Sequence, residues 1–332
     1  MKQKLRKARN IFRPKGIILM YHRIADVNND PWELCVNPEL FKEQLEVLRR
    51  YEEVLPLQEL SERVIHKKSL QKAIALTFDD GYRDNFFEAK KWLERYKVPA
   101  TFFISSGYIG KNREFWWDEL ERLLLTPGKL PERSQLDGEH IITNLGADAE
   151  LTEPTYESFK TWTSKEIPPS KRHTLYLELW QIIRTCPYEK QLQIMDQIAQ
   201  WAGCNLEKRD DYLPMTKEEL VRFIESDFIE IGAHTCYHPD LSLLSIAAQK
   251  KEIFEGKKTL EFWLNKEIDT FSYPFGKYNV DTLSLINEAG FQFAYTTKKG
   301  LANGKQSSFT LPRFQVKNWT GKEFESKLKE WL

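Results

Sequence analysis

The chain has 332 residues, enough for one large α/β domain or two domains of ordinary size whose core needs no disulfide support. Lys plus Arg and Asp plus Glu each number 49, so the formal net charge is zero, which argues against a dedicated nucleic-acid surface. The four cysteines form no C-x-x-C pair, which indicates reduced thiols rather than a zinc knuckle or a disulfide framework.

The N-terminus is basic, and we assign residues 1–15 to a basic N-terminal arm. The apolar run "IILMY" that follows is too short for a signal peptide or a transmembrane span and is interrupted by His22 and Arg23. We therefore predict a cytoplasmic protein without a transmembrane span. The arm could contact an anionic membrane surface as a peripheral anchor, with a solvated, frayed terminus as the alternative.

The first half of the chain alternates apolar and amphipathic stretches. We predict a buried strand over residues 16–24 and, after Asn37, a helix over 38–51. A second strand over 73–80, a helix over 84–96 and a third strand over 99–105 follow. This rhythm is typical of parallel βαβ units.

The rhythm pauses between residues 111 and 215, where the pattern is mostly helical and shows no clear strand. It resumes with a capping box, Thr216 followed by Glu219, which begins a helix. The remaining elements are predicted as strands over 228–235, 268–275, 291–297 and 309–316 and helices over 247–264 and 279–290.

Seven strands that mostly alternate with helices predict a parallel (β/α) barrel formed by residues 16–110 and 216–332, with a large, mostly helical insertion over 111–215. In such barrels, polar residues at the carboxyl ends of the strands line one shared mouth. The polar residues toward the carboxyl ends of the predicted strands are His22, Asp79, Asp80, Ser105, Ser106, His234, His238 and Arg313, together with the "YPFG" turn at 273–276.

These residue types indicate metal chemistry. Two adjacent carboxylates beside a core, Asp79 and Asp80, repel each other unless a cation or a proton compensates them. A carboxylate with two imidazoles leaves open positions on a divalent cation for water and substrate. The pair His234 and His238 alone could equally be solvated in a loop, but the turn "YPFG" adds backbone N–H groups suited to an oxyanion.

Three motifs together resemble those of the polysaccharide deacetylases, the NodB-homology group of carbohydrate esterases (family 4-like): "TFDDG" at 77–81, "HTCYHP" at 234–239 and "YPFG" at 273–276. The resemblance covers about residues 16–110 and 216–316 and implies a distorted (β/α)7-type barrel that removes an N-acetyl group from an aminosugar with a divalent metal. It further implies Asp79 as general base, the backbone N–H of Phe275 facing the oxyanion, and as metal ligands Asp80, His234 and His238.

The chain departs from the family pattern at two places. Ser272 stands where many members have an arginine, and Arg313 stands where many have a Leu-x-His that supplies the general acid. The early "LMYHRI" resembles a strand of members that deacetylate poly-N-acetylglucosamine, so His22 is our candidate acid, with a structural histidine as the alternative. Arg313 is expected to hold Asp79 or the substrate by a bidentate contact, or else to form an ordinary surface ion pair.

Three functions fit these residues. The first is a metal-dependent N-deacetylase, a hydrolase acting on carbon–nitrogen bonds, whose partner is a polysaccharide, oligosaccharide or lipid-linked glycan with an N-acetylated aminosugar. The second is a deformylase or O-deacetylase on a nucleotide- or lipid-linked sugar. The third is a catalytically silent carbohydrate-binding barrel, which Ser272 and the missing C-terminal histidine would favour. We expect zinc as the metal, with iron, cobalt or nickel as alternatives for the same ligand set.

Overall fold

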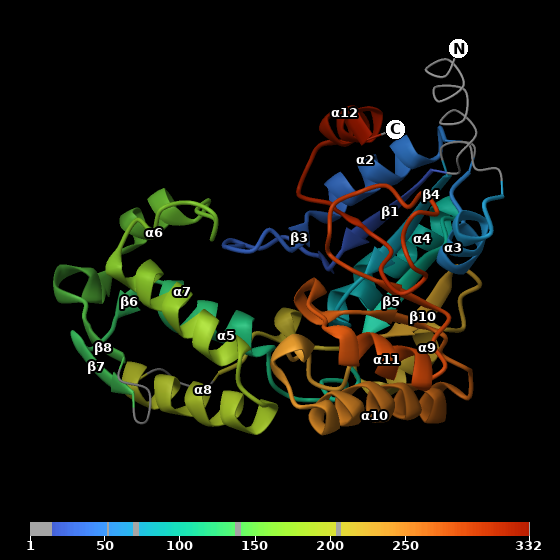
Figure 1. Ribbon diagram of the computed structural model, residues 1–332. Coiled ribbons are helices and arrows are strands. Elements are labelled where there is room, and N and C mark those ends of the chain that lie inside the picture. Colours follow the sequence, from blue (N-terminus) through green and yellow to red (C-terminus); the bar gives the residue numbers. More distant parts are fainter. Residues whose placement is uncertain (1–14, 52, 69–72, 137–140, 204–206, 332) are drawn as a thin grey trace, which may run out of the picture. The chain divides into compact units, whose positions relative to one another are not determined.

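The computed structural model describes residues 15–51, 53–68, 73–136, 141–203 and 207–331 (Figure 1). Their contacts divide the chain into two compact units. The barrel unit comprises the described residues of Met1–Asp26, Leu34–Gly110 and Met215–Leu332, and the second unit comprises Val27–Glu33 and those of Lys111–Pro214. The predicted basic arm lies almost wholly outside the described residues, and none of the described helices is long and apolar enough to cross a membrane.

The barrel unit is built on a seven-stranded sheet in which every registered pair of neighbours is parallel (Figure 1). This confirms the predicted fold, a distorted (β/α) barrel with seven strands. The order across the sheet is β12-β11-β10-β5-β4-β1-β13. The strands are β1 (Gly16–Tyr21), β4 (Ala73–Phe78), β5 (Ala100–Ile104), β10 (Ile229–Ala233), β11 (Thr270–Ser272), β12 (Phe293–Tyr295) and β13 (Phe314–Gln315).

The sheet curls, because side chains of strands that are not neighbours meet on one face. The rings of Phe103 in β5 and Tyr295 in β12 lie 5.4 Å apart, although two strands separate these elements in the sheet. Ile18 belongs to the same buried cluster, whereas its neighbours Ile17 and Leu19 belong to the larger core on the other face. This alternation follows from the two-residue period of a strand, and it gives the sheet an inner and an outer apolar face.

One short stretch, residues 311–316, pairs both with β12 at one end of the strand order and with β1 at the other, and we call it the closing segment. Leu311 bridges to Tyr295 of β12 in parallel, while Phe314 pairs with Leu19 of β1. The strand predicted over 309–316 is shorter in the structure, where only Phe314–Gln315 form β13. Pro312 interrupts it, because proline lacks the N–H that a continuous ladder of hydrogen bonds needs. The closing segment is therefore hydrogen-bonded to both β12 and β1.

Two helices of the barrel unit begin at caps that the sequence predicts. Asn37 caps the helix after β1 with its side chain, and Thr216 and Glu219 form the predicted capping box. Helices α3 and α12 were not predicted from the sequence, and a short π-helical stretch (Asn85–Ala89) precedes α4. The α-helices are α2 (Pro38–Leu48), α3 (Leu57–Ile65), α4 (Lys90–Tyr96), α9 (Lys217–Phe223), α10 (Ile246–Leu264), α11 (Val280–Glu288) and α12 (Gly321–Trp331), and a further strand pair is β2 (Arg23–Ile24) with β3 (Cys35–Val36).

The second unit is mostly helical, as predicted, but the expectation that it lacks strands is wrong. Its helices are α5 (Trp116–Leu125), α6 (Glu153–Phe159), α7 (Lys171–Arg184) and α8 (Tyr188–Ala202). Two antiparallel pairs join β6 (Gly128–Lys129) to β9 (Glu150–Leu151) and β7 (Arg133–Leu136) to β8 (Ile141–Asn144). These strands have two to four residues, too few for an alternating pattern to be recognised.

The second unit also includes a segment that the sequence analysis assigned to the barrel. Val27–Glu33 groups with residues 111–214, and within it the Asn29 amide donates to Glu121 at 3.1 Å while the rings of Trp32 and Trp180 stack at 4.1 Å. The division into a basic arm, a barrel over residues 16–110 and 216–332 and an insertion over 111–215 stays a prediction.

Candidate active site

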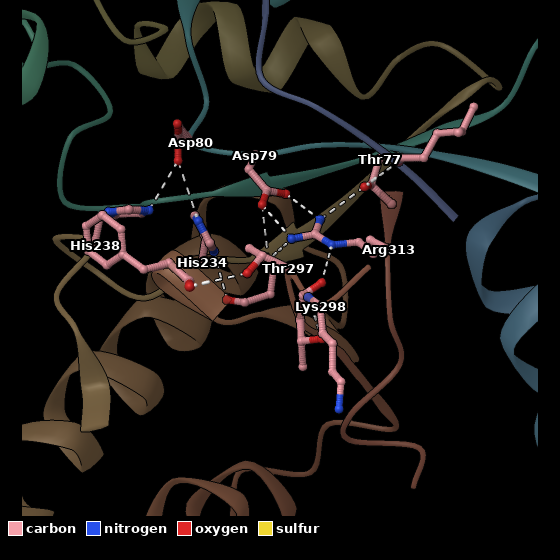
Figure 2. Close-up of polar contacts among 12 residues, drawn as sticks. Thr77, Asp79, Asp80, His234, His238, Thr297, Lys298 and Arg313 are labelled. Atoms are coloured by element: carbon pink, nitrogen blue, oxygen red, sulfur yellow. Dashed lines mark hydrogen bonds and ion pairs between the residues drawn. The ribbon is translucent and has the colours of Figure 1, made fainter. Parts of the chain in front are cut away.

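The carboxyl edge of the barrel sheet brings Asp80, His234 and His238 together from the loops after β4 and β10. The Nε2 atoms of His234 and His238 lie 3.5 and 3.4 Å from Asp80 Oδ1, and Figure 2 shows the carboxylate directed between the two rings. All three side chains are buried, and one donor atom from each lies within 4.8 Å of the others. Separations of this size suit three ligands around one small cation.

The two imidazoles are held in states that can donate a lone pair. Nδ1 of His234 lies 2.7 Å from the carbonyl oxygen of Ser272, so a proton donated there leaves Nε2 free to face Asp80. Burial lowers the pKa of His238 to about 3, which keeps its ring neutral at physiological pH. Neutral imidazoles are the form that binds metals.

The buried carboxylate of Asp80 faces two imidazoles rather than the side chain of an arginine or a lysine. Burial alone would raise its pKa, but its contact with His234 holds the pKa of Asp80 below the ordinary value. Its buried Oδ1 accepts no hydrogen bond within the described part of the chain. An ionised oxygen facing two imidazole nitrogens fits the donor chemistry of a divalent cation such as zinc.

Asp79 is compensated in a different way, by Arg313 of the closing segment. Nη1 and Nη2 of Arg313 donate to Oδ1 and Oδ2 of Asp79 at 2.7 and 2.6 Å (Figure 2). Burial would raise the pKa of Asp79, but this guanidinium holds it well below its usual range. The bidentate contact expected between these two residues is thus present, rather than a surface ion pair, since both side chains are buried.

Arg313 is itself fixed by the surrounding barrel. It also donates to Thr77 Oγ1 at 3.0 Å, to Ser272 Oγ at 2.7 Å and to the carbonyl oxygen of Thr296 at 3.1 Å. Sequence reasoning noted Ser272 only as a departure from the family pattern. The structure places its hydroxyl between Arg313 and Asp79 and its carbonyl on His234, so Ser272 contacts both parts of the site.

His22 lies in the same region, directly after β1. Its backbone oxygen accepts from the Asn85 side chain at 3.0 Å, and the adjacent Arg23 is buried with its Nε 2.8 Å from Asp84. These contacts tie the loop after β1 to the turn that follows Asp80. The half-buried His22 is close enough that its positive charge would lower the pKa of both Asp79 and Asp80.

Phe275 lies in the turn after β11, with its ring 4.5 Å from that of His238. Its φ of 56° is left-handed, which costs energy for a residue with a side chain. The next residue must be glycine, because a Cβ on Gly276 would approach Thr297 Oγ1 to 2.1 Å. Left-handed φ angles also occur at Asp80, Thr235 and His238, so the loops of the site share a strained backbone.

Six of the seven site residues predicted from the sequence thus follow strands at the carboxyl edge of the barrel sheet, and Arg313, just before β13, reaches this edge through its contact with Asp79. Comparisons with known proteins give the family. A protein of Bacillus subtilis (strain 168), YxkH, which is named as a polysaccharide deacetylase, is 23% identical over 301 residues, covering 90% of this chain and 70% of that protein.

Solved structures share the fold. The Streptococcus pyogenes deacetylase PplD in complex with acetate matches with a TM-score of 0.55 and 21% identity, covering 95% of this chain and 99% of that chain. IcaB from Ammonifex degensii matches with a TM-score of 0.59 and 14% identity, and the match covers 95% of this chain and 97% of that chain. At these identities the likeness establishes the architecture only.

The sequence profile of the family described as "Polysaccharide deacetylase" matches residues 66–143 and 196–294, which together make up more than half of the chain. The matched segments contain Asp79, Asp80, His234, His238 and the "YPFG" turn. The chain therefore belongs to the polysaccharide deacetylase family.

Proposed function

We propose that the protein is a metal-dependent deacetylase that hydrolyses the N-acetyl group of an aminosugar in a polysaccharide, an oligosaccharide or a lipid-linked glycan. The observation that carries this proposal is the adjacency of two differently compensated carboxylates: Asp80 faces two imidazoles, while Asp79 beside it is clamped by Arg313. Such a pair divides ligand and base roles between neighbouring residues.

Asp80, His234 and His238 would hold the cation, and zinc suits this set of one oxygen and two nitrogens, with iron, cobalt or nickel as alternatives. When bound, the cation would polarise the amide carbonyl and lower the pKa of water from near 16 toward about 7.

Asp79 is the proposed general base, which takes a proton from the attacking water. Arg313 holds both oxygens of Asp79 in place and keeps the carboxylate ionised, so that it is ready to accept that proton. The base is thereby oriented by a rigid neighbour rather than by a mobile surface side chain.

His22 is the proposed general acid. When the carbon–nitrogen bond breaks, the leaving amine needs a proton, and an imidazole beside Asp79 and Asp80 can supply it. The backbone N–H of Phe275 is proposed to donate to the oxyanion as it forms. Acetate and a free amine are then the products.

The cytoplasmic location and the membrane contact of the basic arm stay predictions of the sequence. Fractionation of cells that produce the tagged full-length chain, with and without a wash in high salt, tests both at once. An electrostatic contact would be released by salt.

The test of the function measures bound metal and acetate release on the same preparations. Wild type is compared with His234→Ala, Asp79→Ala and His22→Ala, and His66→Ala serves as a control because His66 is exposed at the end of α3. We expect one bound zinc per chain in wild type, lost only in His234→Ala, and acetate release from N-acetylglucosamine oligomers that needs Asp79 and His22.

Two results would redirect the proposal. Metal binding without acetate release, but with release of formate or of O-linked acetate from a sugar, would identify the deformylase or O-deacetylase alternative. Wild-type protein that binds no metal at saturating zinc or iron would refute the catalytic proposal and favour a carbohydrate-binding barrel.

A further inference from the structure

The loop between the two histidines of the site is held by side chains at three successive amides. The backbone N–H groups of Cys236 and Tyr237 both donate to Oε2 of Glu252, each at 2.9 Å. The N–H of His238 donates to Oγ1 of Thr235 at 2.9 Å. Every amide from Cys236 to His238 is therefore bound to a side-chain oxygen.

Glu252 reaches this loop from α10, whose close approach depends on a glycine. A Cβ on Gly256 would lie 2.9 Å from the backbone carbon of Thr235, so a larger residue would push the helix away from the loop. Glu252 and Gly256 are four residues apart and thus lie on the same face of the helix. The face of α10 that carries the carboxylate is the one that touches the loop.

The loop also contacts β5 on its other side. The amides of Ser106 and Gly107 donate to the carbonyl oxygens of Thr235 and Cys236 at 3.2 and 2.8 Å. The loop is thus bound between the end of β5 and the first half of α10. Within it, Thr235 and His238 have φ angles of 64° and 55°, a conformation that persists only where the surroundings impose it.

We propose that Glu252 is a positioning residue for the metal centre: by binding two successive amides, it fixes the loop in the strained conformation that turns both imidazoles toward Asp80. This inference rests on the proposed metal role of His234 and His238. A carboxylate accepting two N–H groups forms charge-assisted hydrogen bonds, which are stronger than neutral ones. Without it, the loop could relax toward unstrained φ angles and separate the two rings.

The experiment measures zinc affinity by calorimetric titration of metal-stripped protein for wild type, Glu252→Ala, Glu252→Gln and Glu255→Gln. Glu255 is the matched control, because it is exposed on the same helix and its substitution removes the same charge. Thermal unfolding of each metal-free variant reports its fold separately from its metal affinity.

We expect Glu252→Ala to weaken zinc binding by about 10- to 100-fold, as is typical when a partner that orients metal ligands is lost. Glu252→Gln keeps an acceptor oxygen without the charge and should lose less, and Glu255→Gln should bind zinc like wild type. The zinc affinities are compared only among variants whose metal-free Tm matches that of wild type. If Glu252→Ala does not keep the fold, Glu252→Gln provides the comparison with wild type and Glu255→Gln.

Wild-type affinity in both Glu252 variants would overturn the inference and leave the proposed function intact. An equal loss in Glu255→Gln and Glu252→Ala would also overturn it, since it would point to charge rather than to the loop contact. Wild-type protein that fails to bind zinc or another divalent metal would instead refute the proposed function and the inference together.

Discussion

Buried charges are arranged in opposite ways in the two units. In the second unit, Arg209 lies 2.9 Å from Glu114 and 2.7 Å from Glu121, and Arg122 lies 2.9 Å from Glu114, so each of these buried carboxylates is paired with a guanidinium. In the barrel unit, Asp80 is equally buried but faces two imidazoles.

The difference shows that buried charge by itself does not mark a functional site. A carboxylate paired with arginine is already compensated, and its ion pair serves the fold or its specificity. A buried carboxylate facing neutral nitrogen ligands is compensated only when a cation joins them. Asp79 combines both situations, because its own arginine keeps it ionised next to the ligand cluster.

The largest expected effect concerns this division of roles between Asp79 and Asp80. Asp79→Asn removes the proposed base but no proposed ligand, so kcat for acetate release should fall about 10²- to 10⁴-fold while zinc affinity stays near wild type. Steady-state kinetics and zinc titration measure the two quantities. Asp26→Asn, at an exposed position of the barrel unit, is the control. Unchanged kcat in Asp79→Asn would rule out the base role.

The second prediction tests the structural nature of the ion pairs in the second unit. Arg209→Ala leaves Glu114 and Glu121 buried with one guanidinium fewer, and it should lower the free energy of unfolding by about 3–5 kcal/mol without changing zinc affinity. Urea unfolding measures the loss. Lys165→Ala, which removes an exposed pair with Glu33, should cost about 0–1 kcal/mol. A weaker zinc site in Arg209→Ala would contradict the proposed separation of roles.

Arg313→Lys sharpens the comparison within the barrel unit. A lysine keeps the positive charge but cannot form two parallel hydrogen bonds to Asp79, so the proposed base would be less well oriented. We expect kcat to fall about 10- to 100-fold and the free energy of unfolding to fall by about 1.5–3 kcal/mol. Arg49→Lys, at an exposed position after α2, controls for the substitution itself. Full activity in Arg313→Lys would show that charge alone suffices.

The smallest effect is a pH dependence in the second unit. His173 is buried against the rings of Phe159 and Trp162, beside Arg172 and near Asp148, and burial lowers its pKa to about 4. The unfolded chain, with a histidine pKa near 6.5, therefore binds more protons between about pH 6.5 and pH 4, and stability should fall as the pH falls through this window.

We expect this histidine to account for a loss of about 1–3 kcal/mol between pH 7 and pH 4. Guanidinium unfolding of wild type and His173→Gln at both pH values measures it, with His66→Gln as the exposed control. If His173→Gln lost as much stability as wild type, another group would be responsible.

Much of the barrel could be predicted because its strands are apolar runs that end in polar residues. The site residues follow these ends, so parallel strands bring them to one edge even though they are far apart in sequence. Helix α12 could also have been predicted, since Thr320 and Glu323 provide a capping signal at its start. Helix α3 has no such side-chain cap, because Pro56 precedes it.

Other features depend on pairings that no local pattern encodes. The sequence left open whether Arg313 holds Asp79 or the substrate, and only the strand order, in which β1 alone separates β4 from β13, brings the two residues together across 234 positions. Glu252 looks like any acidic residue on an exposed helix face until the loop after β10 is in place. Val27–Glu33 joins the second unit through contacts such as that of Asn29 with Glu121.

The closing segment is among the last parts of the chain to be synthesised. Translation proceeds from the N-terminus, so Asp79 leaves the ribosome long before Arg313, its partner 234 positions later. The same residues that bring the guanidinium to Asp79 also join β12 to β1. A translation product that stops before residue 311 would lack both the guanidinium beside Asp79 and the pairings that join β12 to β1.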